Sequence, residues 1–364
     1  MSLSGKGFFI WRVQSCEKGD VDAIANLAQA AGLSHILLKV ADGNFSYNID
    51  VKTGEDLAAK LAKALKAKNI PVYGWHYVYG YDPKAEADRA IQRVTQLNLD
   101  GFVINAEVEY KEQFRAARLF MDRLRGGLQS LPIGLSSYRF PGLHSRLPWS
   151  EFLLKCDFCM PQVYWINAHN PADQLKRSLQ MFQKITPFRP LVPTGPLFRQ
   201  GEWEPTVEEI NEFVQTSREL NMTGVNFWEW SKARRYLPEI WNWYAAYDWS
   251  NGQTVSQDIT QLYIAALNQK DLKNIIGLYL DNAVHVTDAN AVQGKAQINT
   301  FFDKLLNQVL PGGIFTLTSR SGNGSVRHLT WTASSRSGSV YNGSDTFGLV
   351  KDKIAYHYTD FSVN

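Results

Sequence analysis

Residues Leu99–Glu109 read LDGFVINAEVE, a short and almost wholly apolar run that ends in two acids. An apolar run of this length is typical of a strand buried on both faces, as in a parallel sheet covered by helices. Because side chains alternate along a strand, its two faces are Val103, Asn105 and Glu107 on one side and Phe102, Ile104 and Ala106 on the other. The run therefore predicts an α/β fold, and its polar face places a candidate site near Glu107.

Similar apolar runs recur along the first part of the chain, separated by amphipathic helical stretches. The expected strands are Gly7–Gln14, His35–Val40, Ile70–Tyr77, Gly101–Glu107, Pro132–Ser137, Asp157–Tyr164, Pro190–Thr194 and Gly224–Trp230. Eight strand–helix units in about 240 residues match a (β/α)8 barrel in number and length. An open doubly wound sheet is the alternative, but no glycine-rich phosphate loop follows any strand.

The expected helices carry boundary signals. Thr206 and Glu209 form a capping box, and Asn170 precedes a proline at the first helical position. Gly32 suits a left-handed helix end. The helices are expected near Val21–Ala31, Gly54–Lys68, Pro83–Gln96, Glu112–Leu128, Trp149–Leu154, Pro171–Lys184, Val207–Leu220 and Tyr236–Tyr244.

Composition narrows the class of protein. The 364 residues are 45% hydrophobic and 20% charged, as in a globular chain, and the net charge of +3 is not concentrated, which excludes a nucleic-acid binder. No run of 18 apolar residues predicts a membrane span, no signal peptide is visible, and the localisation stays open. Cys156 and Cys159 lie three residues apart on an expected strand and favour a core role over a metal or redox role.

The pattern changes in the last third of the chain. Residues 1–249 form the expected barrel, residues 250–257 within the polar run DWSNGQTVSQ form a linker, and residues 258–364 form a second domain. Helices followed by a run of antiparallel strands indicate an α+β domain. Its helices are expected near Asp258–Gln269, Leu272–Leu280 and Gly294–Gln308, and its strands at Ala283–Thr287, Phe315–Ser319, Val326–Ser334, Ser339–Leu349 and Lys353–Phe361.

Barrel active sites lie at the carboxyl ends of the strands. The ends of these strands bring together carboxylates, amides and tryptophans, which suit sugar binding and glycoside cleavage. We expect Glu107 with Asn105 and Tyr164 to be catalytic, and no metal or cofactor is predicted. The expected substrate-binding residues are Asp42, Trp75, His76, Glu109, Tyr138, Gln162, Trp228 and Trp230.

Three strand segments carry a resemblance to a known family: Asp100–Glu107 (DGFVINAE), Met160–Tyr164 (MPQVY) and Gly224–Trp228 (GVNFW). They resemble the DGxDxDxE motif, the Met-x-Tyr-Asp segment and the floor tryptophan of the chitinase-like family 18 glycoside hydrolases. The resemblance covers the barrel architecture and these strand ends, not continuous sequence. It implies that Glu107 protonates the leaving-group oxygen, that Tyr164 holds an acetamido group and that Trp228 stacks beneath the sugar ring.

The same segments depart from the family pattern. Val103 and Asn105 replace two aspartates of the motif, and Trp165 replaces the aspartate after the tyrosine. Asn105 can hydrogen-bond an amide but cannot supply the negative charge that supports attack by the acetamido oxygen. A second carboxylate would have to come from Asp42, Glu109 or Glu229. Two interpretations remain: a glycosidase acting on glycans, N-acetylated glycans among them, or a non-catalytic carbohydrate-binding barrel.

The C-terminal domain carries a resemblance of its own. Asn268-x-x-Asp271 and Gly294-x-x-x-Ile298 with Phe301-Phe302 resemble the SnoaL-like branch of the nuclear transport factor 2-like fold. The resemblance implies a cone-shaped α+β domain with an internal cavity, and often pairing through the sheet. We therefore expect a homodimer through this domain. The residues that would line the cavity are His285, His328, Asp345 and His357, and a small-molecule enzyme centred there is a third interpretation.

Overall fold

A computed structural model describes residues 3–254, 258–322 and 324–364, so residues 255–257 of the predicted linker lie outside the described residues. The chain divides into two compact units, Met1–Val255 and Ser256–Asn364. One part of the predicted linker, β11 (Gln253–Thr254), pairs in the antiparallel sense with β10 (Tyr247–Asp248), which precedes the linker.

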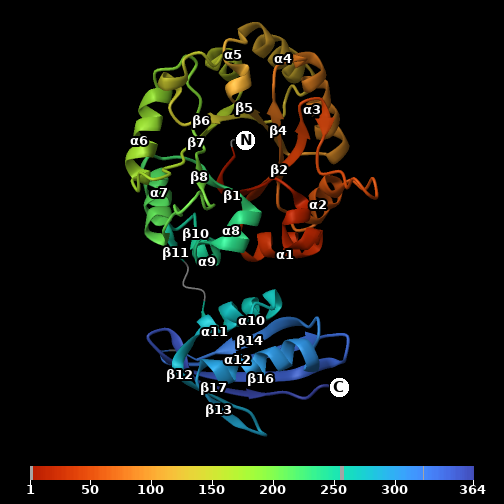
Figure 1. Cartoon of the computed structure of the whole chain (residues 1–364), viewed down its shortest axis with the longest axis vertical. Coiled ribbons are helices and arrows are strands. Elements are labelled where there is room, and N and C mark those ends of the chain that lie inside the picture. The colour runs from red at the N-terminus through yellow and green to blue at the C-terminus, as the bar shows by residue number, and fades with distance from the viewer. Residues whose placement is uncertain (1–2, 255–257, 323) are drawn as a thin grey trace. The chain divides into compact units, whose positions relative to one another are not determined.

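The first unit is a closed parallel barrel, as predicted. Strand β1 pairs in parallel with both β2 and β9, which closes the sheet on itself (Figure 1). The barrel strands are β1 (Gly5–Ile10), β2 (His35–Asp42), β4 (Val72–Val78), β5 (Gly101–Ala106), β6 (Ile133–Tyr138), β7 (Phe158–Gln162), β8 (Thr194–Pro196) and β9 (Gly224–Trp228). The short β3 (Phe45–Ser46) adds to β2 in the antiparallel sense.

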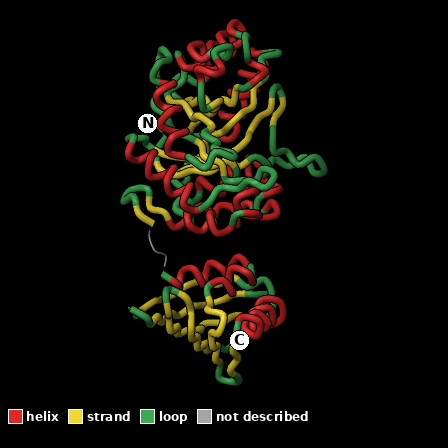
Figure 2. The backbone as a smooth tube through the Cα atoms, turned by 60° about the vertical axis from the view of Figure 1, so that its left-hand side comes forward, coloured by secondary structure: helices red, strands yellow, loops and turns green. Residues whose placement is uncertain are grey.

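Helices surround the barrel strands (Figure 2). They are α1 (Val21–Ala30), α2 (Leu57–Lys66), α3 (Pro83–Leu97), α4 (Phe114–Gly127), α5 (Trp149–Leu153), α6 (Pro171–Phe182), α7 (Val207–Glu219), α8 (Trp230–Tyr236) and α9 (Pro238–Ala246). The capping box of Thr206 and Glu209 begins α7 as predicted. Asn170 is the N-cap residue of α6, but its side chain accepts no capping hydrogen bond.

The side-chain alternation predicted for the segment Leu99–Glu109 is found in strand β5. Val103 packs in the barrel interior, and Phe102 and Ile104 pack in the outer core beneath the helices. The outer core is larger because it is shared by the sheet and the ring of helices. Cys156 and Cys159 are both buried in that outer core, because Cys156 precedes β7 and does not lie on its inward face.

Several strand boundaries differ from the predictions, and three of them bear on the candidate site. Strand β1 ends at Ile10, four residues before Gln14, and β8 begins only at Thr194. Strand β9 ends at Trp228 because the Glu229 carboxylate accepts hydrogen bonds from the backbone amides of Ser231 and Lys232 and starts a helix. A carboxylate at the N-cap satisfies amides that a continuing strand would have paired elsewhere.

The second unit is an α+β domain with one mixed sheet. Its strands, in the order β13-β12-β17-β16-β15-β14, are antiparallel to their neighbours except for the parallel pair β12 and β17. They are β12 (Tyr279–Val286), β13 (Ala291–Gln293), β14 (Ile314–Ser321), β15 (Val326–Ser334), β16 (Ser339–Val350) and β17 (Lys353–Asp360). The helices are α10 (Ile259–Gln269), α11 (Leu272–Gly277) and α12 (Lys295–Lys304), followed by a π-helical turn at Leu305–Val309.

Strand β15 shows how this sheet is oriented. Leu329, Trp331 and Ala333 are buried in the domain core, so this face of the strand meets the helices. His328 is exposed on the opposite face, where it contacts Thr346 of the next strand. Side-chain alternation alone did not say which face was inward, and packing against α10 decides it.

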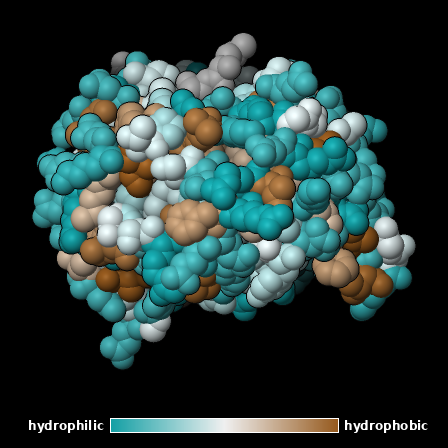
Figure 3. Space-filling model, turned by 90° about the horizontal axis from the view of Figure 1, so that it is seen from above, coloured by the Kyte–Doolittle hydropathy of each residue, from teal (hydrophilic) through white to brown (hydrophobic). Residues whose placement is uncertain are grey.

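The outer surface mixes polar and apolar side chains. On the face shown in Figure 3, hydrophobic side chains are scattered among hydrophilic ones. Scattered apolar side chains are the normal condition of a hydrated protein surface. None of the helices in the described ranges combines the length and apolar character that a bilayer crossing needs.

Candidate functional site

A cavity of about 270 Å³ lies at the carboxyl end of the barrel strands. Its volume is near the lower end of the range for ligand pockets, about 300–1,000 Å³, and suits a small ring rather than a large cofactor. The side chains that line it come from the inward faces of the strands and from the loops that follow them: Phe9, Trp11, Lys39, Trp75, Tyr77, Asn105, Glu107, Ser136, Gln162, Tyr164 and Trp228.

One wall of this central cavity is a polar cluster around Glu107. The Glu107 Oε1 accepts hydrogen bonds from Asn105 Nδ2 at 3.1 Å and from Gln162 Nε2 at 2.9 Å. Gln162 Nε2 also lies 2.9 Å from Asn105 Oδ1, so the three side chains hold one another in place. Within the described residues Oε2 of Glu107 accepts no hydrogen bond, which leaves that oxygen for a ligand.

The opposite wall is aromatic. The Trp228 ring centroid lies 5.3 Å from that of Trp75, 5.5 Å from that of Phe9 and 6.1 Å from that of Trp11. Trp75 is fixed because its Nε1 donates to the carbonyl of Ile10 at 3.1 Å. The ring planes are inclined to that of Trp228 by 68° for Trp75, 58° for Phe9 and 35° for Trp11, so the wall offers separate ring faces against which an apolar ring face can pack.

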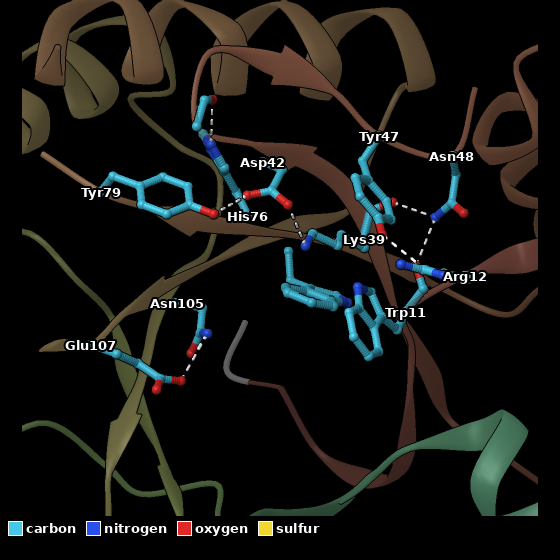
Figure 4. A network of polar contacts seen from close by, with 12 residues as sticks. Trp11, Arg12, Lys39, Asp42, Tyr47, Asn48, His76, Tyr79, Asn105 and Glu107 are labelled. Atoms are coloured by element: carbon cyan, nitrogen blue, oxygen red, sulfur yellow. Dashed lines mark hydrogen bonds and ion pairs between the residues drawn. The ribbon is translucent and has the colours of Figure 1, made fainter. Parts of the chain in front are cut away.

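A buried lysine that the sequence analysis did not single out lies beside this wall. Lys39 is 4% exposed, and its Nζ contacts Asp42 Oδ2 at 2.9 Å (Figure 4). The same ammonium group lies 4.2 Å from the ring centroid of Tyr47 and 4.9 Å from that of Trp75. A desolvated cation among aromatic faces is held by the negative ring faces as well as by the carboxylate.

Two carboxylates proposed as partners of Glu107 are tied to tyrosines. Asp42 accepts from the Tyr79 hydroxyl at 2.9 Å, and Glu109 accepts from the Tyr77 hydroxyl at 2.8 Å. Burial, followed by the bond to Asp42, raises the pKa of Tyr79 to about 12. Burial, followed by the bond to Glu109, raises the pKa of Tyr77 beyond its usual range. Both tyrosines therefore stay protonated and keep donating to these carboxylates.

Neither of these carboxylates lines the central cavity. Tyr77 lies between the cavity and Glu109, and Lys39 lies between it and Asp42. Tyr138, also predicted to bind substrate, stacks on His144 with ring centroids 3.8 Å apart and is outside the cavity lining. Among the residues that the structure describes, Glu107 is the one acid in the cavity wall.

The predicted positions of His76 and Trp230 at the cavity are corrected by the structure. Trp75 points into the barrel, so the next side chain, His76, points outward, where its Nε2 meets the carbonyl of Gly43 at 2.8 Å. Burial lowers the pKa of His76 to about 4. Trp230 is fully buried in α8, 4.6 Å from the ring of Trp241, because the strand has already ended.

Tyr164 lies where the sequence predicts, at the end of β7 in the cavity wall. Burial raises the pKa of Tyr164 well above its usual range, and the charge of Glu107 adds to the shift. The hydroxyl therefore stays protonated, and Tyr164 shares the cavity wall with Glu107. In the described residues, no group of three or more His, Cys, Asp or Glu side chains could hold a metal ion.

The C-terminal domain holds a second polar cluster, sealed in its core. His357 Nε2 lies 2.8 Å from Asp345 Oδ1, and His357 Nδ1 lies 2.7 Å from the Tyr279 hydroxyl. Trp331 Nε1 donates to Asp345 Oδ2 at 2.6 Å. Burial raises the pKa of Asp345 and lowers that of His357 to about 3.

The structure brings three of the four predicted cavity residues of this domain together. The ring of His285 lies 4.4 Å from that of His357, and burial lowers the pKa of His285 to about 3. His285, Asp345 and His357 are each at most 1% exposed. His328 is on the other face of the sheet, so its predicted position with them is corrected. A ligand could reach this cluster only if the domain opened.

The comparisons with known proteins concern this second unit. The family model described as the nuclear transport factor 2 (NTF2) domain matches residues 255–359. The C-terminal part of the chain is an NTF2-like domain. This agrees with the predicted SnoaL-like resemblance, and no curated protein matches the sequence.

Solved structures similar to the chain include an NTF2-like protein of unknown function from Cytophaga hutchinsonii, with 14% identity over 29% of this chain and 88% of that one, at a TM-score of 0.25. A SnoaL-like family protein from Agrobacterium tumefaciens shows 22% identity over 29% of this chain and 94% of that one, at a TM-score of 0.26. An LEH-like epoxide hydrolase from M. tuberculosis shows 14% identity over 29% of this chain and 80% of that one, at a TM-score of 0.25.

Proposed function

We propose that the barrel is a carbohydrate-active domain that holds a sugar ring against Trp228 and uses Glu107 as the general acid of glycoside cleavage. The observation that carries the proposal is the central cavity itself, with an aromatic wall facing a carboxylate held by two amides. Sugar rings pack their apolar face on an aromatic surface while their hydroxyls and glycosidic oxygen meet polar groups.

In this proposal the Glu107 Oε2, which has no protein partner in the described residues, donates its proton to the glycosidic oxygen as the bond to the anomeric carbon breaks. A water molecule then adds to the anomeric carbon and returns a proton to the Glu107 carboxylate. Asn105 and Gln162 fix the other oxygen and so set the direction of the carboxyl group. Tyr164, as a protonated hydroxyl next to Glu107, is placed to hydrogen-bond a carbonyl substituent of the sugar, as the family resemblance implies.

A second candidate is a non-catalytic carbohydrate-binding barrel. It is favoured by one observation: of the described acids, only Glu107 lines the cavity, whereas Asp42 and Glu109 are separated from it by Lys39 and Tyr77. Glycosidases of the two-carboxylate type need a second acid on the other side of the scissile bond. A barrel lacking that acid would bind a glycan without cleaving it.

Chromogenic glycosides of glucose, N-acetylglucosamine and chitobiose separate the two candidates. If the barrel is an enzyme, Glu107→Gln should lower kcat by about 10²- to 10⁴-fold and leave KM nearly unchanged, because only proton donation is lost. Glu208→Gln, an exposed acid on α7, is the matched control. Turnover that is equal in wild type and Glu107→Gln removes Glu107 from the mechanism. Binding without turnover in wild type supports the second candidate.

A further inference from the structure

A second cavity, of about 230 Å³, lies beside the central one at the barrel mouth. It is built by the segment that follows β1 and by α8, which follows β9, and these two strands are neighbours in the barrel. Trp11 belongs to the aromatic wall of the central cavity and also lines the second cavity. A ligand whose ring lies on that wall would therefore carry its substituents toward this second cavity.

The lining of the second cavity is basic. Arg12, Lys232 and Arg235 contribute three cationic side chains, and Ser15 and Ser231 contribute hydroxyls. Lys232 and Arg235 are three residues apart on α8 and so lie on the same side of the helix. None of the three cations takes part in an ion pair within the described residues, whereas neighbouring Arg234 is paired with Glu17 at 2.9 Å.

Arg12 is oriented toward this space. Its guanidinium carbon lies 5.1 Å from the ring centroid of Trp11, and its Nε donates to the Tyr47 hydroxyl at 3.2 Å (Figure 4). These contacts hold the Nε side of the guanidinium. Within the described residues, its two terminal nitrogens make no hydrogen bond, and this is the pair of donors that receives a carboxylate in a bidentate contact.

Glu229 is the acid in the lining, and its carboxylate is buried and hydrogen-bonded. It is 1% exposed, and its carboxylate is occupied by the Ser231 hydroxyl at 2.7 Å and the Lys232 amide at 3.1 Å. Burial raises the pKa of Glu229, and its hydrogen bonds to Ser231 and Lys232 act in the opposite direction. The exposed charges around the second cavity are therefore all positive.

We infer that the second cavity is a subsite for an anionic substituent, above all a carboxylate, of a glycan whose ring lies in the central cavity. The inference rests on the proposed sugar binding and adds the substrate class: acidic glycans rather than neutral ones. Arg12 and Arg235 receive the carboxylate, Lys232 contributes charge, and Ser15 and Ser231 offer hydroxyl donors. The uncharged sugar hydroxyls stay with the Glu107 cluster.

The test compares two ligands that differ only at C6, p-nitrophenyl β-glucoside with a hydroxymethyl group and p-nitrophenyl β-glucuronide with a carboxylate. Calorimetric titration of the full chain at low salt should show about tenfold tighter binding of the glucuronide, as expected for charge-assisted contacts in a partly exposed site. The preference should shrink as salt is added. It should disappear in the Arg12→Gln/Arg235→Gln variant and persist in Lys184→Gln, a control at an exposed lysine that lines neither cavity.

The outcomes separate this inference from the proposed function. Equal binding of the two glycosides by wild type overturns the acidic subsite and leaves sugar binding intact. A glucuronide preference that the arginine variant retains also overturns it. Glucuronide binding that the arginine variant loses but Trp228→Ala keeps upholds the anion subsite and contradicts the sugar site on Trp228. Binding of neither ligand overturns both. Unchanged thermal melting of the variants shows that they remain folded.

Discussion

Removing the Lys39 ammonium group should destabilise the barrel through its effect on Asp42. The side chains of Lys39 and Asp42 are 5% and 29% exposed, so the pair lies between a buried and a surface ion pair. Breaking a buried pair costs about 3–5 kcal/mol, and a surface pair is worth about 0–1 kcal/mol. We expect Lys39→Met to cost about 1–2 kcal/mol, because methionine fills the aromatic surroundings while Asp42 keeps the Tyr79 hydroxyl and some water.

Asp42→Asn should cost more, about 3 kcal/mol, because it leaves the ammonium group buried without a carboxylate. In the double variant neither charge remains, and a coupling energy of about 1–2 kcal/mol should be recovered. Urea unfolding followed by tryptophan fluorescence suits the measurement, since every tryptophan except Trp331 belongs to the barrel. Additive effects, with a coupling energy below about 0.3 kcal/mol, would refute the interaction between Lys39 and Asp42.

Three further predictions concern the helix cap, the C-terminal core and assembly. Thr206→Ala should lower the stability of the barrel by about 1 kcal/mol in urea unfolding, and Thr206→Ser should retain most of it. His285→Leu should stabilise the C-terminal domain by about 1–2 kcal/mol, because neither ring nitrogen has a protein partner in the described residues. Since the folded pKa of His285 is about 3 and the unfolded one 6.5, the unfolded state binds more protons between these values. Stability should therefore fall as pH drops from about 6.5 toward 3, and His285→Leu should weaken that fall; an unchanged pH profile would contradict the assignment. The homodimer stays a prediction: light scattering should give about twice 41.2 kDa for the full chain and a monomer for a truncation ending at Trp249, and a monomeric full chain refutes it.

Periodicity predicted the parts of the site that lie within regular strands. Asn105 lies on the inward face of β5, and Glu107, the residue after that strand, lines the same cavity. Alternation of side chains is a property of any strand. The same rule separates Trp75 from His76, which cannot both face the cavity, and applying it strictly would have excluded His76. Lys39 carried a usable signal as well, because it is the only charged residue between His35 and Ala41 and has the same parity as the inward Leu37.

The parts of the candidate site that lie outside regular strands depend on the residue at which each strand ends. Trp11 lines both cavities because β1 stops at Ile10, and Trp230 is buried among helices because β9 stops at Trp228. The end of β9 is decided by local hydrogen bonding that competes with the sheet, as the Glu229 cap shows. The sequence pattern contains no sharp signal for such a competition, so the second cavity could not be predicted from it.

Affinity for a sugar with and without the Trp228 ring tests the account most directly. Calorimetric titration should compare wild type, Trp228→Ala and Trp249→Ala, a control at a tryptophan outside both cavities, using whichever of the chromogenic glycosides wild type binds most tightly. We predict about tenfold or greater loss of affinity in Trp228→Ala, as expected when a stacking surface is removed, and no change in Trp249→Ala. Equal affinity in all three proteins, or no binding of any glycoside by wild type, would contradict the sugar site.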